Sequence, residues 1–225
     1  MFTLNKKFIS GTRKRGIFVC FIFFTLTAFP QNSNFVKMTD ADKSVFIQNM
    51  QAASKTTHSL QCNFTQKKNS SLLDEAVVSN GMMYFKAPDA LRWEYTSPQA
   101  YAFVMNQGQS VVKNNKGTTA MDAQSSKMIK SMTEMILGMI NGKGLMDNKN
   151  FSAEYYVNQT QTQIKLIPKN ARIKMMFSSI NVIVDKKNYL AQQIEMKESG
   201  GDVTTITLSN IKRNASISDE KFTVK

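Results

Sequence analysis

The chain has 225 residues, of which 42% are hydrophobic and 20% charged, and these proportions exclude an intrinsically disordered protein. Its formal net charge of +13 raises the question of nucleic-acid binding. The lysines are scattered along the chain, however, and form no dense basic stripe interleaved with aromatic residues, so the sequence argues against a nucleic-acid ligand.

The N-terminus has the pattern of a secretory signal peptide, which we assign to residues 1–31. A basic segment is followed by an apolar run at residues 17–29. This run has 13 residues, fewer than the roughly 20 that a membrane-spanning helix needs. A retained membrane anchor is the alternative interpretation. The basic segment contains five cations: Lys6, Lys7, Arg13, Lys14 and Arg15.

Loss of this leader would leave residues 32–225 as a single domain. Five cations and no anions leave with it, so the net charge becomes 13 − 5 = +8. Cys20 is also lost, which leaves Cys62 alone and excludes an intrachain disulfide. We expect an exported protein of the periplasm, whose positive charge favours transient contact with anionic lipid head groups.

The first element expected after the leader is a helix. Thr39 or Asp40 can cap its start, and the pattern continues to about Ser54. Apolar residues recur at helical spacing, which predicts one buried face. This face is expected to contain Val45, Phe46, Met50 and Ala53.

The hydrophobic period then changes from 3.6 to 2. Leu60, Cys62 and Phe64 alternate with polar residues, which predicts a half-buried strand. A second strand is expected to bend or bulge at Gly81. The connections are too short for parallel crossovers, so the strands should be antiparallel neighbours. After the first strand, and including the one with Gly81, strands are expected at residues 75–86, 91–95, 101–106, 110–114, 118–122, 151–158, 162–169, 180–187, 189–198, 203–213 and 221–225.

A methionine-rich amphipathic helix is expected within residues 125–142. Methionine is flexible and polarisable, and it suits apolar surfaces that must adapt to a ligand. Two interpretations stay open: ordinary packing of the helix against the sheet, or a deformable lid over a cavity for aliphatic chains. The apolar face contains Met128, Met132, Met135, Ile136 and Met139.

The sequence offers no constellation for catalysis. His58 is the only histidine, and it lies at a helix-to-strand junction with no implied nucleophile. One cysteine and one histidine do not make a metal site. The glycines near residue 142 lack the spacing of a phosphate-binding loop. We therefore expect no enzyme activity, no metal and no cofactor.

The stretch GMMYFKAPDALRWEYTSP, residues 81–98, resembles the LolA family of periplasmic lipoprotein carriers. The stretches CNFTQKK and INVIVDKKNYLAQQIEM, and the segment that ends in DEKF, resemble other strands of the family. The positions that carry the main motif are Gly81, Lys86, Pro88, Leu91, Arg92, Trp93 and Pro98.

The resemblance implies an α+β fold: an open, incomplete antiparallel β-barrel of about ten to eleven strands with a helical lid over an apolar cavity. The cavity of the family holds lipoprotein acyl chains. Some family members carry an arginine directly before the proline that is thought to hold the lid closed, whereas this chain has Ala87 there. The side chains expected to bind the acyl chains are Leu60, Phe64, Met83, Phe85, Leu91, Trp93, Tyr95, Phe103, Met128, Met132, Met135, Ile136 and Met139.

The function implied is that of a monomeric periplasmic chaperone that carries lipoproteins from the inner to the outer membrane. Its implied partners are acylated lipoproteins, an inner-membrane ABC release complex and an outer-membrane acceptor. An unshielded acyl chain of about 16 carbons costs roughly 13 kcal/mol in water, so the task needs a cavity and not a catalyst. The alternatives are a periplasmic lipid-sensing regulatory protein of similar fold and a lipid hydrolase; the missing nucleophile–histidine pair argues against the hydrolase.

Overall fold

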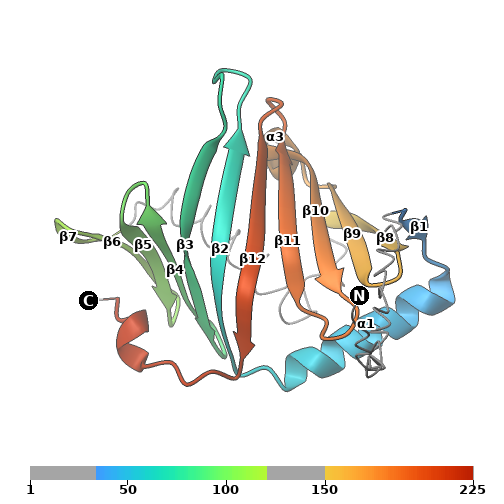
Figure 1. Ribbon diagram of the computed structural model, residues 1–225, viewed down its shortest axis with the longest axis horizontal. Coiled ribbons are helices and arrows are strands. Elements are labelled where there is room, and N and C mark those ends of the chain that lie inside the picture. The colour runs from blue at the N-terminus through green and yellow to red at the C-terminus, as the bar shows by residue number, and fades with distance from the viewer. Residues whose placement is uncertain (1–33, 121–149, 225) are drawn as a thin grey trace, which may run out of the picture. The chain divides into compact units, whose positions relative to one another are not determined.

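The computed structural model describes residues 34–120 and 150–224, all within one compact unit, Asn32–Lys225 (Figure 1). The expected signal peptide and the methionine-rich helix lie outside the described residues. The described strands are β1 (Val36–Lys37), β2 (Ser59–Asn69), β3 (Val77–Lys86), β4 (Ala90–Ser97), β5 (Tyr101–Asn106), β6 (Gln109–Asn114), β7 (Gly117–Ala120), β8 (Phe151–Val157), β9 (Gln161–Pro168), β10 (Phe177–Asp185), β11 (Ala191–Glu198) and β12 (Val203–Arg213). The helices are α1 (Asp40–Lys55), α3 (Ala171–Met176) and the 3₁₀ helix η1 (Asp219–Phe222).

The twelve described strands form one antiparallel sheet in the order β1-β8-β9-β10-β11-β12-β2-β3-β4-β5-β6-β7. Strand β2 pairs with β12, so the first long strand and the last lie side by side at the centre of the sheet (Figure 1). The edge strands β1 and β7 do not pair with each other. The predicted fold class, an α+β protein with an open antiparallel sheet, is confirmed.

Helix α1 begins as the sequence predicted. The Thr39 side chain accepts a hydrogen bond from the Asp42 backbone N–H, and this satisfies one of the unpaired donors of the first turn. Phe46 and Met50, one turn apart, are buried, and the Phe46 ring packs edge-on against Tyr155 of β8. The prediction that Val45 shares this face is wrong, because its side chain is 56% exposed. Each step along a helix turns by about 100°, so a neighbour of Phe46 points elsewhere.

One face of the sheet carries the main apolar core. Alternate residues of the strands point to it, as the period of 2 requires. In register across four strands, for example, Leu60 faces Phe85, Phe85 faces Leu91, and Leu91 faces Met105. The half-buried strand predicted from Leu60, Cys62 and Phe64 is confirmed as β2, whose three apolar residues are all buried.

The C-terminus differs from the prediction. Residues 221–225 were expected to form a strand, but the chain forms η1 instead. The Ser218 side chain caps η1 by accepting from the Glu220 N–H, and Phe222 is buried against Tyr84 and Ala90 on the other face of the sheet. Phe222 is therefore a single buried side chain between polar neighbours, and this pattern does not indicate a strand. The pair Lys86–Asp219 holds the same helix to the end of β3.

Candidate functional site

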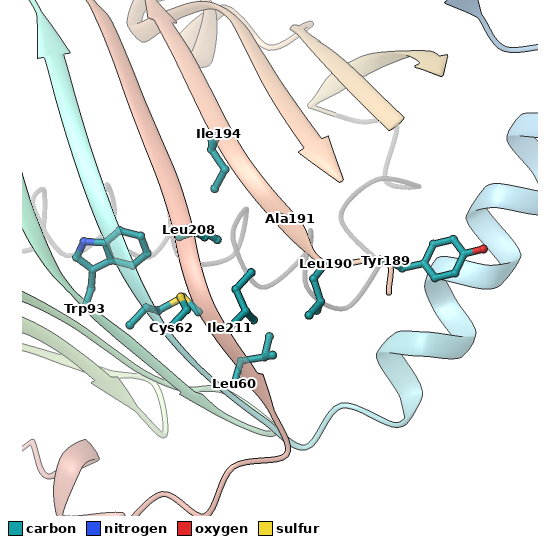
Figure 2. Close-up of a pocket in the computed structure, with 10 residues that line it drawn as sticks. Leu60, Cys62, Trp93, Tyr189, Leu190, Ala191, Ile194, Leu208 and Ile211 are labelled. Carbon is teal, nitrogen blue, oxygen red and sulfur yellow. The ribbon is translucent and has the colours of Figure 1, made fainter. Parts of the chain in front are cut away.

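An apolar pocket lies on the core face of the sheet, over its central strands. The space in and around it that no atom occupies, open solvent included, is about 450 Å³. Figure 2 shows Trp93 at one end and Tyr189 at the other, with Cys62, Ile211 and Leu190 between them. The lining residues are Leu60, Cys62, Met83, Trp93, Tyr189, Leu190, Ala191, Ile194, Leu208 and Ile211.

Strand register brings one side of this lining together. Cys62 of β2 pairs with Met83 of β3, and Met83 pairs with Trp93 of β4. All three side chains are buried and share the core face. The neighbours of Trp93 point the other way, where the Arg92 Nε donates to the Glu94 carboxylate at 2.8 Å. The Arg-Trp-Glu sequence is therefore an ordinary strand whose tryptophan alone reaches the pocket.

A β-bulge in β12 builds the opposite side. Ser209 pairs with Asn63 and Lys212 with Gln61, so β12 has one residue more than β2 between these two pairs. Asn210, inside the bulge, has φ of 51°, a left-handed conformation that asparagine tolerates better than most residues. The extra residue changes the phase of the alternation. Leu208 before the bulge and Ile211 within it both line the pocket.

The β10–β11 turn supplies Tyr189 and Leu190. The Asp185 backbone N–H donates to the Leu190 carbonyl, and the Tyr189 N–H donates back to the Asp185 carbonyl at 2.9 Å. The Asp185 side chain accepts from two further backbone N–H groups of the turn. The strands expected at residues 180–187 and 189–198 implied a turn here, and the turn is longer than they allowed because β10 ends at Asp185 and β11 begins at Ala191. Its internal hydrogen bonds hold the Tyr189 ring against Phe46 of α1, with ring centroids 5.9 Å apart.

An aromatic cluster backs the Trp93 end of the pocket. The Phe64 ring stacks on Trp93 with centroids 4.3 Å apart, and Tyr95 packs edge-on against Phe64 at 5.1 Å. Phe103 and Tyr101 of β5 extend the cluster. Burial raises the pKa of Tyr95 to about 12, so its hydroxyl is neutral at pH 7. This hydroxyl donates to the Gln66 side chain at 2.9 Å.

The structure sorts the predicted acyl-binding residues into three groups. Three of them line the pocket: Leu60, Met83 and Trp93. Five belong to the surrounding apolar cluster without lining it: Phe64, Phe85, Leu91, Tyr95 and Phe103. The other five lie outside the described residues: Met128, Met132, Met135, Ile136 and Met139.

Seven lining residues were not among the predicted ones. Cys62 and Leu208 follow from strand alternation and could have been included. Ile211 could have been predicted to line the pocket only if the bulge in β12 had been recognised. The sequence signal for that bulge is Asn210, a residue type that tolerates a left-handed backbone. The remainder come from the β10–β11 hairpin, which lies beside β12 and comes near β2 only through the long-range pairing of β12 with β2: Tyr189, Leu190, Ala191 and Ile194.

The chemistry of the pocket is that of an apolar binding site. Among its ten lining side chains, only the Cys62 thiol, the Trp93 indole N–H and the Tyr189 hydroxyl carry a polar hydrogen, and none is charged. Within residues 34–120 and 150–224, no cluster of three or more potential metal ligands occurs. His58 is exposed, and its backbone N–H donates to Asn214. The arrangement can bind a nonpolar chain by burial of surface.

Cys62 gives a direct test of how closed the floor of this pocket is. Burial raises the pKa of its thiol to about 12, so the thiol stays protonated at pH 8, and only the thiolate reacts with disulfide reagents. We expect Ellman's reagent to react with Cys62 at least about 100-fold more slowly in the folded protein than in guanidinium. A Cys20→Ser variant removes the other cysteine. Equal rates in the two conditions would contradict the burial.

Outside the residues left undescribed, the protein contains no helix that combines the length and the hydropathy needed to cross a membrane.

Similarity to known proteins extends over most of the chain. The family described as "Outer membrane lipoprotein carrier protein LolA" matches residues 55–225. An outer-membrane lipoprotein carrier protein of Francisella tularensis is 27% identical over 211 residues, which cover 94% of this chain and 93% of the relative.

The solved structures that match this chain include two of low sequence identity. The crystal structure of MucB matches with a TM-score of 0.50 at 11% identity, over 81% of this chain and 62% of that one. The LolA superfamily protein NE2245 from Nitrosomonas europaea matches with a TM-score of 0.41 at 10% identity, over 79% of this chain and 97% of that one.

Proposed function

This chain belongs to the LolA family of outer membrane lipoprotein carrier proteins, and from this membership we propose that it is a periplasmic chaperone that carries lipoproteins from the inner to the outer membrane. Residues 1–31 are its secretory signal peptide in this proposal. An inner-membrane ABC release complex would deliver the cargo, and an outer-membrane acceptor would take it.

The observation that carries the proposal is the uncharged pocket over strands β2, β3, β4, β11 and β12. An acyl chain laid along it would exchange water for Leu, Ile, Met and Trp side chains. Each buried methylene group contributes about 0.8 kcal/mol, so even half of a chain of about 16 carbons gives roughly 6 kcal/mol of burial. Because no charged group lines the pocket, release of the chain breaks no ion pair, which suits a carrier.

The test uses the exported protein recovered without its leader, whose intact mass reports the cleavage. Trp93 is the only tryptophan of the chain, and it lines the pocket. We expect a synthetic acylated lipopeptide to shift the tryptophan emission to shorter wavelength, because the chain displaces water near the indole. The unacylated peptide of the same sequence should leave the emission unchanged.

A second measurement follows the lipopeptide from donor to acceptor vesicles. A carrier should accelerate this transfer, whereas a lipid-sensing regulatory protein would bind the lipopeptide without accelerating transfer. Failure of the lipopeptide to bind at all would overturn both assignments. An unchanged emission with binding demonstrated by another method would place the chain away from Trp93.

A further inference from the structure

Exposed apolar side chains gather at one end of the sheet. Among the described residues, eight large hydrophobic side chains are exposed, and six of these lie in two short segments. The first segment is the β2–β3 connection, where Leu72 is 89% exposed and Leu73 53%. Val77 and Val78 follow at the start of β3. The second segment is the end of α3, with Met175 and Met176.

The β11–β12 turn joins these two segments. Lys68 of β2 forms ion pairs with Glu198 at 3.1 Å and with Asp202 at 3.3 Å, and the Ser70 hydroxyl donates to Asp202. On the other side of the turn, the Ser199 N–H donates to the Met176 carbonyl at 3.1 Å. Figure 1 shows the β2–β3 tip, the β11–β12 turn and α3 at the same end of the sheet. We call this end the apolar rim.

The segments of the apolar rim carry charged side chains, with cations in excess over anions. Apart from the Lys68–Glu198–Asp202 cluster, the segments at residues 67–78, 169–178 and 197–203 carry five cations and two anions. The anions Asp74 and Glu75 follow Leu73 directly, and three of the cations lie in or next to α3. The cations are Lys67, Lys169, Arg172, Lys174 and Lys197.

We propose that the apolar rim docks the protein on the surface of an anionic lipid bilayer, with Leu72 and Leu73 inserted below the head groups. A tip of two adjacent leucines on a hairpin has the shape of a wedge that enters a fluid layer. The cations of α3 complement the negative head groups, as basic residues beside an inserted apolar group do at membrane surfaces. The inference rests on the proposed function, because a carrier must approach a membrane to collect and to deliver its cargo.

The experiment measures flotation of the leader-free protein with vesicles. One set contains phosphatidylethanolamine and phosphatidylglycerol at 3:1, a second contains only phosphatidylcholine, and a third consists of native membrane vesicles that retain their proteins. The variant Leu72→Ser/Leu73→Ser removes the wedge, and Arg172→Gln/Lys174→Gln removes two cations. Val45→Ser is the matched control, since Val45 is an exposed apolar residue on α1, outside the rim.

We expect the wild type and Val45→Ser to bind the anionic vesicles equally. The leucine variant should lose about tenfold or more in partition coefficient, the amount expected for about 1.4 kcal/mol. The cation variant should bind more weakly at low salt and match the wild type at high salt, where its charges are screened. Binding to phosphatidylcholine alone should be weaker for every variant that keeps the leucines.

Three outcomes would overturn the proposal. In the first, the leucine variant binds lipid vesicles as well as wild type does. In the second, Val45→Ser loses as much binding as the leucine variant. In the third, the leucine variant loses binding only to membranes that contain protein. The last outcome would assign the rim to a protein partner. Lipopeptide binding followed through Trp93 tests the proposed function separately from membrane docking. This binding should be the same in wild type and in all variants. If wild type did not bind the lipopeptide, acyl binding would be refuted, and membrane docking would still be decided by the flotation result.

Discussion

Gly81→Ala is expected to cost about 3 kcal/mol or more of folding free energy, an unusually large effect for the addition of one methyl group. A Cβ at this position would lie 2.0 Å from the Glu94 carbonyl oxygen and 2.5 Å from Cζ of Phe64. The first contact is with backbone, which cannot rotate away. The second is with the ring that stacks on Trp93. Either the β3–β4 pairing or the aromatic cluster must therefore shift.

The register explains why glycine is needed here. Gly81 faces Phe64 directly across the β2–β3 ladder, and the β3–β4 register shifts between Asn80 and Gly81. The missing side chain lets the Phe64 ring lie over β3, an arrangement in which an aromatic ring covers a strand glycine. The same glycine thus allows both the bend of β3 and the position of the ring behind the pocket.

Thermal unfolding followed by circular dichroism measures the effect. For a domain of this size, a loss of about 3 kcal/mol corresponds to a fall in Tm of roughly 6–12 °C. Gly200→Ala is the control, because its Cβ would meet no atom within 4 Å. A melting temperature for Gly81→Ala within about 2 °C of wild type would show that the β3–β4 contact relaxes more easily than the geometry implies.

Much of the sheet could be predicted because its signal is local. The alternation of Leu60, Cys62 and Phe64 identifies a strand and its buried face without knowledge of any partner. Gly81 indicated the irregularity in β3 for a similar reason, since glycine within a strand has a restricted set of uses. The motif around Trp93 placed the tryptophan on the core face, and this agrees with its burial.

The pocket itself could be predicted only in part, because it depends on contacts between distant residues. Strand β12 lies beside β2 although some 140 residues separate them, and no local pattern specifies that neighbour. Simple alternation through Asn210 would place Ile211 on the outer face. A one-residue bulge reverses the assignment of every later residue in the strand. The same limit explains η1, where Phe222 is buried by packing against Tyr84.

Ile211→Asp is expected to lower the affinity for an acylated lipopeptide by about 100-fold, which corresponds to roughly 2.7 kcal/mol. Ile211 lines the pocket together with Leu60 and Cys62. An acyl chain that filled this space would remove water from the carboxylate, and no cation lines the pocket to pair with it. The complex would therefore carry the desolvation cost of an unpaired charge, or the chain would bind without reaching this end.

The free protein should tolerate the same change far better. Ile211 is only partly buried, so the carboxylate can remain in contact with water when the pocket is empty. A loss of about 1–2 kcal/mol in folding free energy is expected, which leaves the domain folded.

Ser209→Asp is the matched control, because Ser209 is an exposed residue of the same strand, just before the bulge. Both variants add one negative charge within three positions of each other, so a general electrostatic effect on the lipopeptide would appear in both.

Titration through Trp93, together with the melting temperature of each variant, separates weaker acyl-chain binding from loss of folding. Weak binding by Ile211→Asp alone, with a folded protein, supports acyl-chain burial against β12. Equal binding by wild type and Ile211→Asp would mean that the chain occupies some other part of the molecule.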